Sequence, residues 1–73
     1  MSIGTVIDVI DKDGRFHQIF KNLGLKGYNP SKQELDKARS IVAECYPNYK
    51  RAELVVMHYD KNDYNDKNKR IEL

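Results

Sequence analysis

The most constraining feature of this sequence is one short segment that carries a helix start signal and a helix stop signal. Ser31 and Glu34 have the S-x-x-E spacing of a capping box, in which each side chain accepts the backbone N–H of the other residue. An alternative start places Asn29 at the cap and Pro30 at the first helical position, where proline is tolerated. Pro47 ends the helix close to residue 46. The signals therefore predict one helix of about 15 residues.

Apolar residues recur within this helix at intervals of three and four, which places them on one face. The members of this stripe are Leu35, Ala38, Ile41, Val42 and Cys45. The opposite face is polar and is expected to be solvated; it carries Lys32, Asp36, Lys37, Arg39, Ser40 and Glu44. A helix of this length is marginal alone in water, so the stripe must pack on another layer.

Three segments predict strands: residues 3–10, where β-branched residues dominate, and residues 15–21 and 52–59, which carry aliphatic and aromatic side chains. The D-K-D-G sequence at 11–14 is a turn signal that joins the first two strands into a hairpin. The centre of the third strand, residues 54–57, is apolar on both faces, as in a strand that is covered on both sides. The helix can cover one face, and a partner or a second copy of the chain is a candidate for the other.

The register of the hairpin has two solutions. If Ile10 pairs with Arg15, both phenylalanines share a face with Ile7 and Val9, and Asp8 lies opposite His17. A three-residue turn with a bulge pairs Ile10 with Phe16 instead and changes the faces. The first register is preferred because it gathers the phenylalanines with the other apolar side chains.

The remaining segments are expected to be connections. Residues 22–29 form a loop whose Leu23, Leu25 and Tyr28 tuck under the start of the helix, and its Gly24-x-x-Gly27 element is expected to permit turns rather than to cradle a phosphate. Residues 60–70 predict a flexible polar loop, and residues 71–73 either add a fourth, edge strand or trail off.

These elements predict a single α+β domain over residues 1–73, of the order β-β-α-β with an optional fourth strand. One helix packs on an antiparallel sheet. The predicted core is Ile7, Val9, Phe16, Phe20, Leu35, Ala38, Ile41, Val42, Cys45, Leu54 and Val56.

Composition bounds the class of protein. A chain of 73 residues buries about 60% of its unfolded surface and is modestly stable unless it associates. One cysteine suits a reducing compartment, and neither a leader peptide nor a run of about 20 apolar residues is present, so we expect a cytoplasmic protein without a membrane span. The content of Lys, Asn, Tyr and Ile is compatible with a phage or mobile-element accessory protein.

Catalytic chemistry is not expected. His17, His58 and Cys45 lie on different elements, which gives no metal site, and the Asp-rich residues 60–72 lack the glycine and the glutamate positions of a calcium loop. Ser31 serves as a cap, and no phosphate-binding loop or dinucleotide fingerprint occurs. We therefore expect no catalytic residue, no cofactor and no metal.

A protein-binding module, an inhibitor or adaptor that docks on a larger protein, is the preferred hypothesis. Five of the seven aromatic residues are tyrosines, which favour interfaces. The predicted contact residues are Tyr28, Lys32, Lys37, Arg39, Tyr49, Lys50, Arg51 and Tyr64. Partners through the sheet include a second copy, which would make a homodimer.

A nucleic-acid-binding accessory domain is the alternative, for RNA or DNA. Basic residues on the helix, after it and near the end of the chain could form a positive footprint. Thirteen basic and eleven acidic residues give a net charge of only +2, and the two signs are interleaved. That balance makes the alternative weaker than the protein-binding hypothesis.

Overall fold

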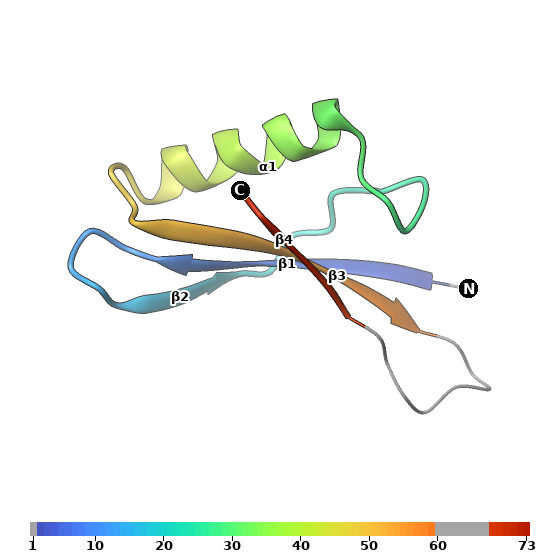
Figure 1. The fold of residues 1–73 in the computed structure, drawn as a ribbon, viewed down its shortest axis with the longest axis horizontal. Coiled ribbons are helices and arrows are strands. Elements are labelled where there is room, and N and C mark those ends of the chain that lie inside the picture. The colour runs from blue at the N-terminus through green and yellow to red at the C-terminus, as the bar shows by residue number, and fades with distance from the viewer. Residues whose placement is uncertain (1, 60–67) are drawn as a thin grey trace.

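A computed structural model describes residues 2–59 and 68–73, and it contains one helix packed on a four-stranded antiparallel sheet (Figure 1). The elements in chain order are β1 (Ser2–Ile10), β2 (Phe16–Ile19), α1 (Lys32–Cys45), β3 (Arg51–Tyr59) and β4 (Lys69–Glu72). The strands lie in the order β2-β1-β3-β4, so the two long strands are central and the two short strands are the edges. The predicted α+β class is confirmed.

The helix begins and ends where the sequence signals predict. The Oγ of Ser31 accepts the backbone N–H of Glu34 at 3.2 Å, and the Oε1 of Glu34 accepts the N–H of Ser31 at 2.9 Å, so the capping box is complete. The N–H of Ser31 is the main cause that lowers the pKa of Glu34. Tyr46 donates its N–H to the carbonyl of Val42 and closes the helix before Pro47.

The main core lies between α1 and the two central strands. Alternate residues of β1 and β3 point toward the helix, and Ala38 and Val42 of the helix point back at them. The residues with no exposed surface are Ile7, Val9, Ala38, Val42, Leu54 and Val56. Leu35 and Ile41 are partly buried at the margin of this core. Eight of the predicted core residues therefore belong to it or pack against it.

The loop after β2 is anchored to this core, as predicted. Leu23 is buried, and Leu25 and Tyr28 pack against the same cluster. The hydroxyl of Thr5 donates to the carbonyl of Lys21 at 2.6 Å and accepts the N–H of Leu23 at 3.1 Å. These bonds hold the loop beside β1 where β2 has ended.

The preferred register of the hairpin is wrong, and the bulged alternative is the one observed. Ile10 pairs with Phe16, and Asp8 pairs with Gln18 rather than with His17. The hairpin has a three-residue loop in which Gly14 takes a φ of +83° and donates its N–H to the carbonyl of Asp11. Phe16 therefore lies on the sheet face opposite Ile7 and Val9.

Three predicted core residues are consequently outside it. Phe16 is 58% exposed and Phe20 is 80% exposed, both as a result of the register. Cys45 is exposed as well; it is the last residue of α1, and the next residue, Tyr46, packs on the core in its place.

The third strand is apolar on both faces, as predicted. Leu54 and Val56 face the helix, whereas Val55 on the opposite face is only 3% exposed. A fourth strand also forms at the edge, and the N–H of Leu73 extends its ladder to the carbonyl of Ala52. Lys69 and Arg70 thus belong to β4 rather than to the predicted loop, and residues 60–67 lie outside the described residues.

Candidate protein-interaction surface

The predicted contact residues are divided between different sides of the molecule. Lys32, Lys37 and Arg39 are exposed on the outer side of α1, and Lys50 is exposed just before β3. Arg51 points to the face of the sheet away from the helix. Tyr28 and Tyr49 are half-buried against the core, and Tyr64 lies outside the described residues. The structure does not gather these residues into one patch.

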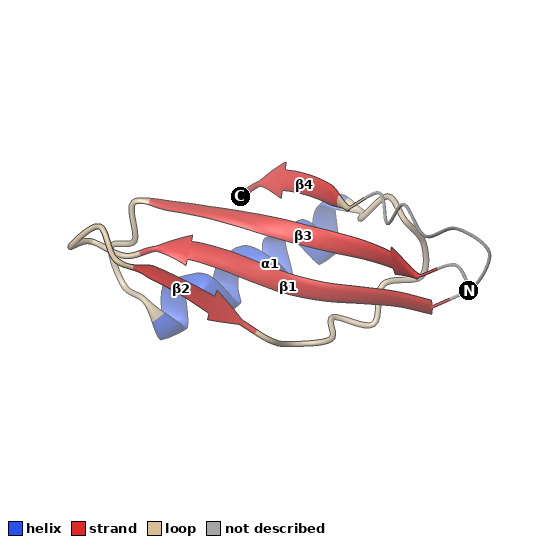
Figure 2. Ribbon diagram, turned by 90° about the horizontal axis from the view of Figure 1, so that it is seen from below, coloured by secondary structure: helices blue, strands red, loops and turns tan. Residues whose placement is uncertain are grey.

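The sheet face away from the helix is the face for which the sequence predicts a partner or a second copy as cover, but sequence reasoning did not place the two phenylalanines on it. Figure 2 looks at this open face directly, and none of the described segments crosses it. Val6 and Val55 pair at its centre and are almost fully buried by their neighbours. Phe16, on the edge strand, lies on the same face opposite Ile10, and Phe20, one residue beyond β2, continues the alternation.

A chain of polar contacts crosses the open face from one edge of the sheet to the other. Gln18 of β2 donates its side-chain amide to Asp8 Oδ1 at 3.0 Å, and Arg70 of β4 donates to Asp8 Oδ2 at 2.9 Å. Arg70 pairs with Val55 in the ladder, so its stem must pass over β3 to reach Asp8. An arginine stem can bury apolar surface while its head stays polar. This accounts for the burial of Val55 on a face that none of the described elements covers.

A shallow hollow of about 430 Å³ lies between Phe16, at the β2 edge, and the polar contacts that Asp8 makes with Arg70. Its walls include Phe16 and Ile10 on one side and Arg51 and Arg70 on the other. Arg51 also forms an ion pair with Glu72 at 3.5 Å. The open face thus combines exposed aromatic surface, a depression and fixed hydrogen-bonding groups, which is the mixture found in interfaces.

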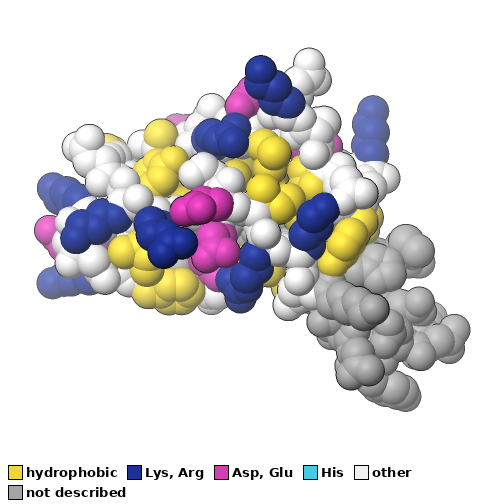
Figure 3. Space-filling model, viewed as in Figure 1, with side chains coloured by type: hydrophobic (Ala, Val, Ile, Leu, Met, Phe, Trp, Pro, Cys, Tyr) yellow, Lys and Arg dark blue, Asp and Glu magenta, His cyan; other side chains and the backbone are white. Residues whose placement is uncertain are grey.

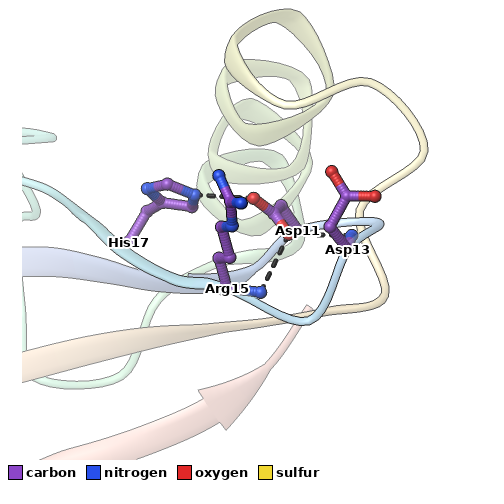
Figure 4. A network of polar contacts seen from close by, with 4 residues as sticks. All are labelled: Asp11, Asp13, Arg15 and His17. Atoms are coloured by element: carbon purple, nitrogen blue, oxygen red, sulfur yellow. Dashed lines mark hydrogen bonds and ion pairs between the residues drawn. The ribbon is translucent and has the colours of Figure 1, made fainter.

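A second polar cluster, shown in Figure 4, lies at the turn of the hairpin. Asp11 Oδ1 accepts the N–H groups of Asp13 and Arg15 at 2.8 and 2.9 Å, and Asp11 Oδ2 lies 2.8 Å from His17 Nε2. The hydrogen bond with His17 is the main cause that lowers the pKa of Asp11 to about 2, followed by the N–H of Arg15. The His17 ring stacks on Tyr46, with centroids 4.5 Å apart.

This turn cluster has a clear structural role. The bonds of Asp11 close the three-residue loop, and the stacked ring ties the hairpin to the end of α1. A carboxylate that orients a histidine also occurs in catalytic triads, where the histidine activates a nucleophile. A candidate nucleophile near this cluster is the thiol of Cys45, which lines a separate hollow of about 240 Å³ together with Asp11 and Tyr46. His17 does not line that hollow, so the imidazole and the thiol do not share this cavity.

Metal binding finds no support in the part of the chain that the structure covers. Among residues 2–59 and 68–73, no group of three or more His, Cys, Asp or Glu side chains is placed to hold an ion. Within the same residues, no helix combines the length and the apolar character that crossing a bilayer requires.

Comparison with known proteins gives no relative from which a function could be transferred. No protein-family model matches the chain, and no curated protein or solved structure matches it significantly. The geometry of the open face and of the hairpin edge beside it is therefore the basis for inferring a function.

Proposed function

We propose that this protein is a small non-enzymatic binding module that docks on a larger protein and modulates it, and that the open face of the sheet is its contact surface. The observation that carries the proposal is the exposure of Phe16 and Phe20, at 58% and 80%. Both stand on or beside the edge of a sheet face that no described segment covers (Figure 2). Aromatic side chains of this kind are enriched in the centre of interfaces and often supply much of the binding energy.

The polar groups of the open face favour a protein partner over a purely apolar ligand. The ion pairs of Arg70 with Asp8 and of Arg51 with Glu72 place charged groups around the hollow. A polar rim around an aromatic centre is the usual anatomy of a protein interface. Arg51, which the sequence already marked as a contact residue, lies within this surface.

The test is a pull-down with three forms of the full chain as bait. The wild type should retain a stoichiometric protein partner, and the double variant Phe16→Ser/Phe20→Ser should lose it. The matched control is Lys37→Ser, on the outer side of α1, which should retain the partner. Circular dichroism must show the same helix content for all three baits. Equal recovery by the double variant, or no stoichiometric partner for the wild type, would overturn the proposal.

Nucleic-acid binding remains the second candidate. Lys32, Lys37 and Lys50 are exposed, but Arg39 is paired with Asp36 at 2.7 Å, and Arg51 and Arg70 are paired with acidic residues on the open face. Figure 3 shows the two signs of charge and apolar groups intermixed on the side in view. Binding to mixed RNA and DNA that weakens steeply between about 50 and 200 mM salt would support this candidate. Absence of binding at low salt would remove it.

A further inference from the structure

We propose that the outer edge of β2 binds an extended segment of the partner protein as an added antiparallel strand, with apolar side chains over Phe16 and Phe20 and an acidic residue near each end. This inference rests on the proposed function and specifies its binding mode and the chemistry of the ligand. Strand addition at an open sheet edge is a common way for a domain to bind a peptide segment.

No other described strand pairs with the outer side of β2, so the backbone hydrogen-bonding groups on that side are free. Asp11 donates its N–H to the carbonyl of Arg15 at 2.9 Å, which makes these two residues a hydrogen-bonded pair of the hairpin. Such pairs alternate along an antiparallel ladder, so His17 and Ile19 also direct their backbone groups toward β1. Phe16 and Gln18 therefore direct their N–H and C=O groups away from the sheet.

The two edge strands differ in the side chains of the residues whose backbone groups point outward. By the same alternation, the bond from Leu73 to Ala52 turns the backbone groups of Arg70 and Glu72 outward at β4. Charged side chains at outward positions discourage pairing with another strand. The outward residues of β2 are uncharged, and one of them is an exposed phenylalanine. The β2 edge is therefore the one suited to accept a strand.

The charge around β2 selects the chemistry of the added strand. Arg15 and Lys21 lie at the two ends of this edge, and residues 15–21 contain no acidic side chain. Two carboxylates contact residues of this edge, and both already have partners. Asp11 is bound to His17 and to two backbone N–H groups of the turn. Asp8 is bound to Gln18 and Arg70. A segment with an Asp or Glu opposite each basic residue is complementary to this arrangement.

The same charges disfavour a second copy of this chain as the occupant. Two β2 edges pairing antiparallel about Gln18 would bring Arg15 of one copy opposite Lys21 of the other, at both ends of the ladder. Like charges directly opposite each other destabilise a strand pair. The partner is thus inferred to be a different protein.

The test uses the peptide acetyl-Asp-Ile-Thr-Val-Thr-Ile-Asp-amide and a matched peptide with lysine at both ends. Fluorescence anisotropy with the full chain should show the acidic peptide binding at least about tenfold more tightly than the lysine peptide at low salt. Amide hydrogen exchange should slow at Phe16 and Gln18 when the acidic peptide is bound.

Three variants separate strand pairing from side-chain contact. Gln18→Pro removes an outward N–H without removing a backbone bond to β1, whereas Gln18→Ala keeps that N–H; both variants lose the side-chain amide that binds Asp8. The proline variant should bind the acidic peptide at least about tenfold more weakly than the alanine variant. Glu72→Pro, which blocks the outward N–H of β4, should bind as the wild type does.

The outcomes distinguish this inference from the proposed function. Equal binding of the two peptides, no binding of either, or equal affinity of the Gln18 variants would overturn strand addition at β2. The pull-down could still show a partner lost with the phenylalanines, and the proposed function would then stand without the inference. A dimer in sedimentation that Gln18→Pro dissociates would show that the edge serves a second copy, which would also overturn it.

Discussion

Replacing Phe20 by alanine should cost little stability, although phenylalanine is among the most apolar residues of the chain. Its side chain is 80% exposed, so the fold removes about one fifth of it from water. Aromatic side chains bury roughly 150–250 Å² when fully enclosed, so Phe20 buries roughly 30–50 Å². At about 25 cal/mol per Å², the expected loss in the free energy of unfolding is about 1 kcal/mol.

The preferred register from the sequence would place the same side chain in the core, where Phe→Ala costs about 3–5 kcal/mol. Urea unfolding of the wild type and of Phe20→Ala, followed by circular dichroism, separates the two values. Leu54→Ala is the control, because Leu54 has no exposed surface and should lose about 2–5 kcal/mol. A loss above about 3 kcal/mol for Phe20→Ala would refute the observed register and, with it, the open face as described.

Three other predictions test separate parts of the fold. The pKa of Asp11 is lowered from 3.8 to about 2 in the folded state. Its carboxylate therefore stabilises the folded state above about pH 4, and this stabilisation is lost as the pH falls toward 2. In urea titrations, Asp11→Asn should reduce the fall in the free energy of unfolding between about pH 4 and about pH 2. An equally steep acid limb in the variant would contradict the role given to the turn. Ser31→Ala should lower the free energy of unfolding by about 1 kcal/mol through loss of the helix cap, and no change in the urea midpoint would argue against the capping box. Cys45 is exposed, so a thiol reagent should modify it in the native protein within about a factor of ten of the unfolded rate, whereas strong protection would place the thiol in the core.

The candidate site could be predicted from the sequence only in part. The two-sided apolar pattern of β3 already indicated that the sheet has a second face in need of cover, and Arg51 was among the predicted contact residues. The phenylalanines were assigned to the wrong face because the alternation of a strand is equally regular in either register. The signal that could have decided between the registers was local: an Asp that opens a D-x-D-G turn can bind the N–H groups that follow it.

The sequence by itself determined the helix and its boundaries, because caps, proline and the three-to-four spacing act within one or two turns of the chain. It also determined the approximate positions of the first three strands and the α+β class. Only the tertiary structure decided which face of the sheet each side chain occupies, since a shift of one residue in pairing inverts every position. The bonds of Asp11 close the turn that sets this pairing, and the ring of Tyr46 rather than the thiol of Cys45 closes the core. As a result, Phe16 and Phe20 face solvent, at the edge where we expect a partner strand.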